Sequence, residues 1–321
     1  MSLTARVTRR KIGAVEWGSK TTSRPAPTEA DGRGADSPIT LRAGTPEDAA
    51  ACGAICFEAF GALAGKHAFP ADFPSVEVAR GLCAMLLAHP GFYSVVAEVD
   101  GSVVGSNFLD ERAVIAGVGP LTVDPKAQER GVGRLLMDDV LEQARVRGAA
   151  GVRLLQAAYH NRSLALYARL GFAVREPMAC MQGPPIGSPF SDRDVRPATE
   201  DDVEPCNRLC RFVHGHDRNV ELRDGIRQGS ARVVERHGCI TGYASAIAFF
   251  GHAVGESTDD VEALLADATA FEGPGVLVPV RNTALFAWCL DHGLRVVQLM
   301  TLMTVGLYNE PDGAYLTSVL Y

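Results

Sequence analysis

The sequence predicts a mixed α+β fold, an α/β arrangement around a mixed sheet, present in two tandem copies. Segments with strand and helix periodicity alternate along the chain, with three strands of antiparallel type near the middle of the first copy. The dipeptide Asp100-Gly101 forms a tight turn between two of these strands, which is typical of a β-hairpin. The opening and the ending of the first copy both recur in the second half of the chain.

The first copy opens with a short alternating strand at residues 39–42, and a helix follows from Thr45. Thr is a capping residue and Pro46 suits the first helical position. The acids Glu47 and Asp48 face the positive end of the helix. The other elements expected are helices at 76–89, 131–147 and 163–170 and strands at 92–99, 102–109, 113–123, 152–157 and 172–181.

Residues 195–202 repeat the pattern of residues 41–48, and residues 281–294 repeat that of residues 159–172. We interpret this as a tandem duplication with a degraded second copy, a chance echo being the alternative. The expected division is a disordered tail at 1–37, a catalytic domain at 38–183, a linker at 184–194 and a degenerate domain at 195–321. An organelle transit peptide is the alternative for the tail.

Length and composition restrict the classes of function. The chain has 321 residues, which suits two domains, and a net charge of -7, which argues against a general nucleic-acid binder. No apolar run approaches the length of a membrane-spanning helix, so no membrane partner is expected. The eight cysteines are scattered, which favours buried core thiols over a metal site. We therefore expect a reducing, cytoplasmic compartment.

The segment at residues 119–134 carries the clearest chemical signal, because a strand feeds a glycine-containing loop that opens into a helix. Gly131 and Gly133 remove side chains where a backbone must approach a ligand closely. Free N–H groups at a helix start, together with the helix dipole, form an anion site suited to a pyrophosphate. Arg130 and Arg134 would add positive charge. A purely structural turn is the alternative.

The surroundings of this loop resemble the GCN5-related N-acetyltransferase (GNAT) superfamily over about residues 39–182. The resemblance is carried by Leu121-x-Val123-x-Pro125, Gln128-x-x-Gly131-x-Gly133, Leu166-Tyr167 and Leu170-Gly171-Phe172. It implies the GNAT fold and acetyl-CoA as the co-substrate. Carried over by position, it implies a cofactor-binding set of Leu121, Thr122, Val123, Gln128, Glu129, Arg130, Gly131, Val132, Gly133, Arg134 and Asn161.

The resemblance also implies that Tyr167 protonates the departing CoA thiolate, the alternative being a core tyrosine. The wider family usually has Asn seven residues before this tyrosine, where this chain has His160, followed by Asn161. Either residue could hold the pantetheine arm or a substrate, and His160 could instead transfer a proton. The candidates for the base that deprotonates the amine are Glu98, Asp110, Glu111 and His160, of which we select His160 and Glu111.

Pro120 lacks a backbone donor, which favours a break in strand pairing or an edge position. Residues 66–74, with His67 and two phenylalanines, either line an acceptor pocket or pack the loop onto the core. The second copy lacks the cofactor loop, has acids at the matching helix start and places Cys289 at the position of the tyrosine. We therefore expect one cofactor per chain, with a non-catalytic second half that walls the acceptor site or mediates association, including as a homodimer.

The predicted function is acetyl transfer from acetyl-CoA to a primary amine of a small molecule, peptide or protein. A fold that binds acyl-CoA without turnover, as a sensor or interaction module, is the alternative. The acceptor does not follow from the fold.

Overall fold

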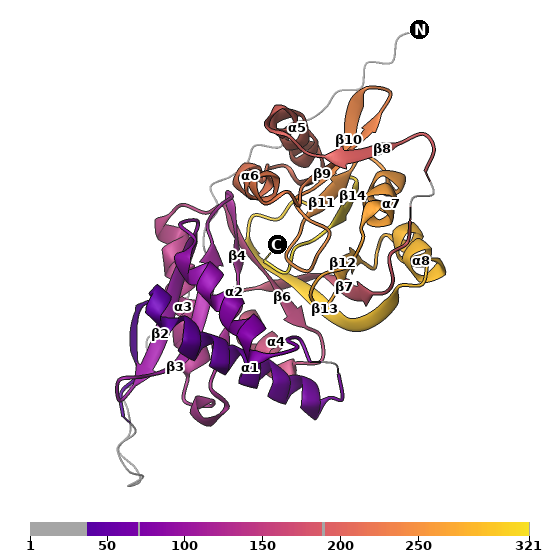
Figure 1. The fold of residues 1–321 in the computed structure, drawn as a ribbon. Helices are drawn as coiled ribbons and strands as arrows, with labels where there is room; N and C mark the ends of the chain where they lie inside the picture. Colours follow the sequence, from indigo (N-terminus) through magenta and orange to yellow (C-terminus); the bar gives the residue numbers. More distant parts are fainter. Residues whose placement is uncertain (1–36, 70, 188–189, 321) are drawn as a thin grey trace.

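The computed structural model describes residues 37–69, 71–187 and 190–320. The tail expected at residues 1–37 therefore lies outside the described residues, apart from Ser37. Figure 1 shows the first half of the chain, in indigo and magenta, beside the second half, in orange and yellow, with the C-terminus between them.

The elements of the first half follow the expected order closely. They are β1 (Thr40–Ala43), the 3₁₀ helix η1 (Pro46–Asp48), α1 (Ala49–Lys66), α2 (Val76–Ala88), β2 (Phe92–Val99), β3 (Ser102–Asp110), β4 (Ile115–Val118), β5 (Thr122–Val123), the 3₁₀ helix η2 (Pro125–Ala127), α3 (Val132–Val146), β6 (Gly151–Ala157), α4 (Asn161–Arg169) and β7 (Ala173–Gln182).

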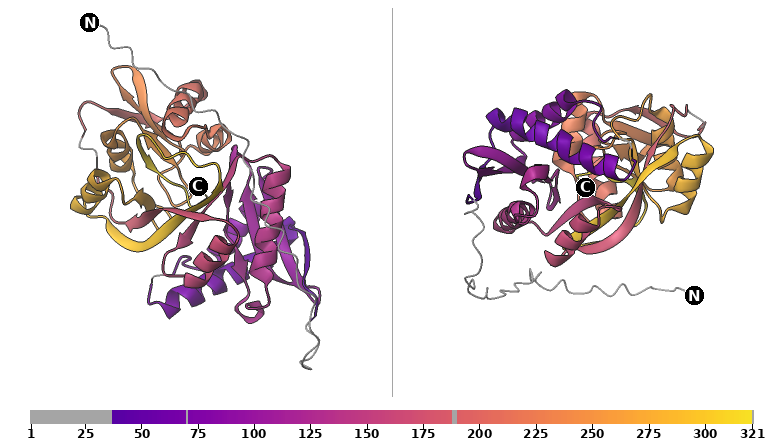
Figure 2. Two further views of the ribbon diagram at one scale, coloured as in Figure 1. Left: turned by 180° about the vertical axis from the view of Figure 1, so that it is seen from behind. Right: turned by 90° about the horizontal axis from the view of Figure 1, so that it is seen from below.

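Successive side chains of β2 and β3 point to opposite faces of the sheet, and apolar residues on both faces are buried. Val96 and Phe108 point toward α1 and α2, whereas Val95 and Leu109 point toward α3. Seen from below in Figure 2, α1 and α2 lie across one side of this sheet. The sheet is therefore covered on both faces, as a mixed α+β domain requires.

The second half repeats most of this order. Its elements are β8 (Asp194–Pro197), the 3₁₀ helix η3 (Glu200–Asp202), α5 (Val203–His214), α6 (Asn219–Gln228), β9 (Arg232–Arg236), β10 (Cys239–Ala244), β11 (Ala253–Gly255), α7 (Thr258–Asp267), β12 (Val276–Pro279), α8 (Thr283–Asp291), β13 (Arg295–Gly306) and β14 (Ala314–Leu316).

The two copies share an ion pair at their openings. Arg42 on β1 makes a bidentate contact with Asp48, with two N···O distances of 2.7 Å. Arg196 on β8 makes the same contact with Asp202, at 2.8 Å for both. In both copies the aspartate also accepts a bond from the backbone N–H three residues before it, which closes a capping box. The mixed fold in two tandem copies is thus confirmed.

The two halves interleave their strands. The larger sheet has the order β1-β2-β3-β4-β6-β13-β7-β12, with β5 paired to β3, so two strands of the second half join it. Met300–Gly306 of β13 pairs with β6 on one side, and β13 pairs with β7 on the other. In Figure 2, viewed from behind, β13 is the long yellow strand that runs from the second half toward the first. The sheet thus continues across the boundary expected at residues 184–194.

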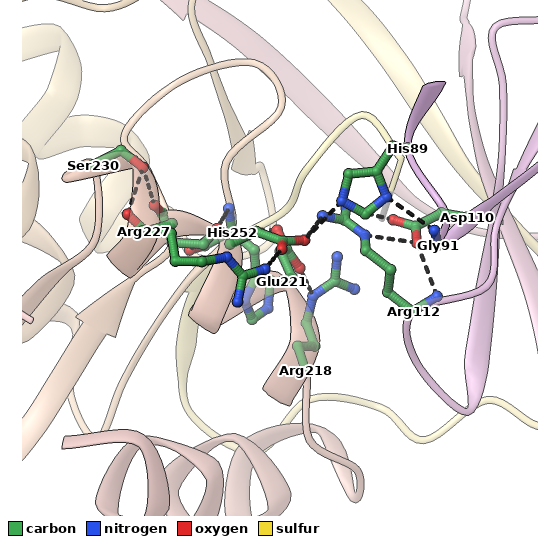
Figure 3. A network of polar contacts seen from close by, with 12 residues as sticks. His89, Gly91, Asp110, Arg112, Arg218, Glu221, Arg227, Ser230 and His252 are labelled. Atoms are coloured by element: carbon green, nitrogen blue, oxygen red, sulfur yellow. Dashed lines mark hydrogen bonds and ion pairs between the residues drawn. The ribbon is translucent and has the colours of Figure 1, made fainter. Parts of the chain in front are cut away.

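Buried charges also join the halves, as Figure 3 shows. Arg112, just after β3, donates to Asp110 at 2.9 Å and to Asp224 of α6 at 2.8 Å. His89, after α2, lies 3.4 Å from the same Asp224 carboxylate. Since the carboxylates are only 7% exposed, a partner removed from this network would leave a buried charge uncompensated.

By length and composition, one described helix, Pro46–Lys66, could span a membrane. The expectation that no apolar run comes near this length is corrected to that extent. The helix packs Cys52 and Cys56 into the core beside Val96 and Phe108, and the core helices of globular domains satisfy the same criterion.

Candidate active site

The sheet of the first half opens at its centre. β4 pairs with β6 in parallel as far as Gly117 and Arg153. Beyond that point β5 pairs only with β3, and no described pairing joins it to the end of β6. The break spans residues 119–121 and contains Pro120, which has no N–H to donate, as the sequence predicts. Backbone groups of β5 and β6 are thereby left facing a space between the strands.

This space is a cavity of about 780 Å³. Most residues of the segment 118–134 line one side, residues at the end of β6 and on α4 line another, and the end of α1 lines a third. The second half contributes the remaining wall. Its lining residues are Phe249, Phe250, Pro274, Gln298, Met300, Val319 and Leu320. A cavity of this size suits a small-molecule ligand together with a second substrate.

The glycine loop enters α3 in the geometry of an anion site. Gly131 caps the helix with φ of 87°. The N–H groups of Arg134 and Leu135 bond to the Gly131 carbonyl, so the N–H groups just before them have no acceptor within the helix. Gln128 holds the loop to β5 by donating to the Val123 carbonyl at 3.4 Å. Unpaired donors at a helix start favour a bound phosphate.

Gly133 separates the ligand interpretation from that of a structural turn. Its φ is not in the left-handed region, and a Cβ built there would make only ordinary contacts, the nearest at 3.7 Å to Val123. Neither backbone conformation nor packing among the described residues therefore requires glycine at this position. A ligand lying over the loop would require it, and this favours close approach of a ligand.

Ten of the eleven residues in the predicted cofactor-binding set line the cavity, and Arg130 is the exception. Arg130 donates to the Ser37 carbonyl at 2.8 Å, which directs its side chain away from the loop. The sequence prediction missed two other basic residues that line the cavity, Arg162 and Arg169. Arg162 lies 3.4 Å from Glu129 of the loop, a position from which it can reach a phosphate. Both could have been proposed from the sequence, because both lie on the short helix α4 that follows β6.

Tyr167 projects from α4 into the cavity and packs against Phe172, with ring centroids 6.0 Å apart. Burial raises the pKa of the Tyr167 phenol to about 12. The phenol is therefore protonated at neutral pH, as a proton donor must be.

His160 and Asn161 also line the cavity, at the start of α4. Burial lowers the pKa of His160, and the nearby charges of Arg162, His67 and Lys66 lower it further. A neutral imidazole at this position can accept a proton near pH 7.

Glu111 does not belong to this site. Its Oε1 accepts a bond from Gln143 at 3.0 Å and lies 3.7 Å from Arg147, both on the α3 side of the sheet. The other two carboxylate candidates are also engaged elsewhere, Glu98 with Arg42 and Asp110 with Arg112. None of the three lines the cavity, so His160 alone remains from the predicted bases.

The loop between α1 and α2 fits both of the interpretations left open. Phe69 stacks on Tyr159 with centroids 4.4 Å apart, which packs the loop onto the start of α4. His67 and Phe73 nevertheless line the cavity. Asp72, in the same loop, also lines it and was not selected from the sequence.

The second half has no equivalent anion site at the start of α7. Asp260 accepts bonds there from the Ser257 backbone and hydroxyl and from Thr241. A carboxylate already occupies the positive end of this helix and would repel a phosphate. Cys289 is fully buried, and burial raises its pKa to about 12, which is typical of a core thiol.

Comparisons with known proteins find similarity to one family of enzymes. Residues 64–172 match the family described as the acetyltransferase (GNAT) family. An IAA acetyltransferase of Azospirillum brasilense is 32% identical over 93 residues, which are 28% of this chain and 61% of that protein. The chain aligns with less than two thirds of the length of each of the curated relatives it matches.

Two solved structures resemble the fold over nearly the whole chain. A protein of Pyrococcus horikoshii described as an acetyltransferase has a TM-score of 0.67 and 18% identity, covering 86% of this chain and 94% of that one. A tandem GNAT protein from the clavulanic acid biosynthesis pathway has a TM-score of 0.53 and 16% identity, covering 84% and 98%. Residues 64–172 of this chain thus match the GNAT family, and the chain as a whole has the tandem fold of these two structures.

Proposed function

We propose that this protein transfers the acetyl group of acetyl-CoA to the primary amine of an acceptor by direct attack. One observation carries the proposal: the opened strands, the glycine loop and Tyr167 surround a single cavity. The pyrophosphate of the cofactor would lie on the N–H groups at the start of α3. Its pantetheine arm would pass between β5 and β6, whose facing backbone groups are free to bind it.

The chain's own residues account for the proton transfers of this reaction. The neutral amine nitrogen attacks the acetyl carbonyl carbon, and the carbon–sulfur bond breaks. Tyr167 donates its proton to the departing sulfur, and His160 accepts the proton that the nitrogen loses. Holding the amine and the thioester together supplies much of the acceleration.

A thiol-release assay of the purified chain with acetyl-CoA and a panel of primary amines tests the proposal. We expect free CoA thiol to form only when an amine is added, with one acetylated amine per thiol. Binding of acetyl-CoA without amine-dependent thiol release would contradict the enzyme and support a sensor or interaction module instead.

A further inference from the structure

One end of the cavity has an apolar lining, to which both halves contribute. Phe60 of α1 and Phe73 pack edge to face with centroids 5.8 Å apart. Phe249, Phe250 and Met300 of the second half line the same cavity. Such a wall favours an apolar ligand body and offers little to a highly polar one.

One carboxylate, Asp72, lies in this apolar end. It accepts a bond from Gln298 Nε2 at 3.3 Å, and Gln298 is itself 6% exposed. Gln298 belongs to β13, so a strand exchanged between the halves places it here. Within residues 37–69, 71–187 and 190–320, no Lys, Arg or His nitrogen lies within ion-pair distance of Asp72.

The surroundings of Asp72 penalise its negative charge. Burial raises the pKa of this carboxyl, and the bond from Gln298 opposes that rise only in part. Partial burial of a carboxylate without a cation beside it has a free-energy cost, because the charge loses hydration. A cation bound beside the carboxylate offsets part of this cost. Lys66 and His67 also line the cavity, and both are exposed.

We propose that Asp72, oriented by Gln298, binds the acceptor in its ammonium form, which releases one proton to solvent before the neutral nitrogen attacks, and that the acceptor is a primary amine with an apolar aryl or alkyl body. This inference rests on the proposed function, since it assigns the acceptor end of the same cavity. The one carboxylate pairs with one positive charge, and the phenylalanines contact the apolar body that carries this charge. Polycationic acceptors, which need several anionic contacts, fit this end poorly.

The test uses the full-length chain saturated with CoA and two probes of nearly equal shape, 2-phenylethylamine and 2-phenylethanol. Calorimetry should show that the wild-type protein binds the ammonium compound more tightly than the alcohol. Asp72→Asn should remove this preference. It should raise the Kd of the amine about 10- to 100-fold, which corresponds to the loss of a charge-assisted hydrogen bond. Gln298→Leu should weaken it less, because the charge remains.

Glu58→Gln is the matched control, since Glu58 is exposed on α1 and does not line the cavity. Like Asp72→Asn, it removes one negative charge, but it should leave the affinity for both probes unchanged. In steady-state assays Asp72→Asn should raise the KM of the amine and leave the KM of acetyl-CoA unaltered, which a general structural defect would not do.

The outcomes separate the two proposals. Equal binding of both probes by the wild-type protein, or an unchanged preference in Asp72→Asn, would overturn the role of Asp72 whatever the turnover. A preference that Asp72→Asn removes, in a protein that acetylates no amine, would support the cation site and contradict the proposed function.

Discussion

Tyr167 is the residue whose chemistry can be tested most directly. Because burial raises its pKa to about 12, its phenol keeps its proton across the usual assay range. We expect Tyr167→Phe to lower kcat about 100-fold, the typical contribution of a general acid, and to leave the KM of acetyl-CoA nearly unchanged. A kcat that stays within a factor of two of wild type would contradict the assignment.

The pH profile checks the same residue. A general acid loses activity as the pH rises through its pKa, so Tyr167 should cause no fall in kcat below about pH 10. Tyr93→Phe is the control, since Tyr93 donates to Asp139 at 2.7 Å and does not line the cavity. It should leave both kcat and its pH profile unchanged.

Gly131 allows a second prediction at a single residue. Gly131 and Gly148 both have positive φ, 87° and 71°, and no atom of residues 37–69, 71–187 or 190–320 would lie within 4 Å of a Cβ added at either. Replacing either by Ala should lower the free energy of unfolding by about 1–2 kcal/mol, the cost of a left-handed alanine. Only Gly131 caps the helix at the cavity, whereas Gly148 follows the far end of α3.

We therefore expect Gly131→Ala, and not Gly148→Ala, to raise the KM of acetyl-CoA about 10- to 100-fold. The physical reason is the loss of a bond between a backbone N–H and the charged phosphate. Chemical denaturation and steady-state kinetics on both variants provide the two measurements. An equal effect of both variants on KM would favour the structural-turn interpretation of the loop.

At the scale of elements, the repeated ion pair at the start of each copy makes stability depend on pH. The bond from Arg42 lowers the pKa of Asp48 to about 2, and the bond from Arg196 lowers that of Asp202 to about 2. A depressed carboxyl pKa stabilises the fold above the unfolded value near 3.8, and this contribution disappears as the pH falls through the folded value.

Asp202→Asn should thus lower the free energy of unfolding by about 1–2 kcal/mol at pH 7, after allowance for the partly exposed arginine. The difference from wild type should shrink between about pH 4 and pH 2. Asp201→Asn, at the exposed neighbouring position, is the control and should have a much smaller effect. A constant difference down to pH 2 would contradict the role of the ion pair.

Local signals made most elements predictable from the sequence. The strand expected at residues 92–99 matches β2, and the break at Pro120 follows from a missing donor. Glu111 was misplaced because the sequence does not show which face of the sheet its carboxylate reaches. Gln298 could not be assigned to the cavity, because the sequence of a strand does not show which sheet the strand joins. The roles of the cavity residues in binding and catalysis stay predictions.

At the scale of the whole molecule, the exchange of strands makes the two halves depend on each other. Without β13, the edge of β6 would be unpaired and β7 would lose its neighbour in the larger sheet. The second half also supplies one wall of the cavity. We therefore expect folding, cofactor binding and acceptor binding to be coupled across the chain, although the glycine loop belongs to the first half.

This coupling predicts how the chain behaves when it is divided between β7 and β8. Expressed alone, residues 1–187 should not form a native domain and should not bind acetyl-CoA, because exposed strand edges favour aggregation. Co-expressed with residues 188–321, they should form a complex of one copy of each fragment that binds acetyl-CoA as the intact chain does. Size-exclusion chromatography and calorimetry measure both outcomes, with the intact chain as the control. An isolated first fragment that is monomeric and binds acetyl-CoA with unchanged affinity would show that the exchanged strands are not needed, since β6 and β7 would then have closed the sheet without β13.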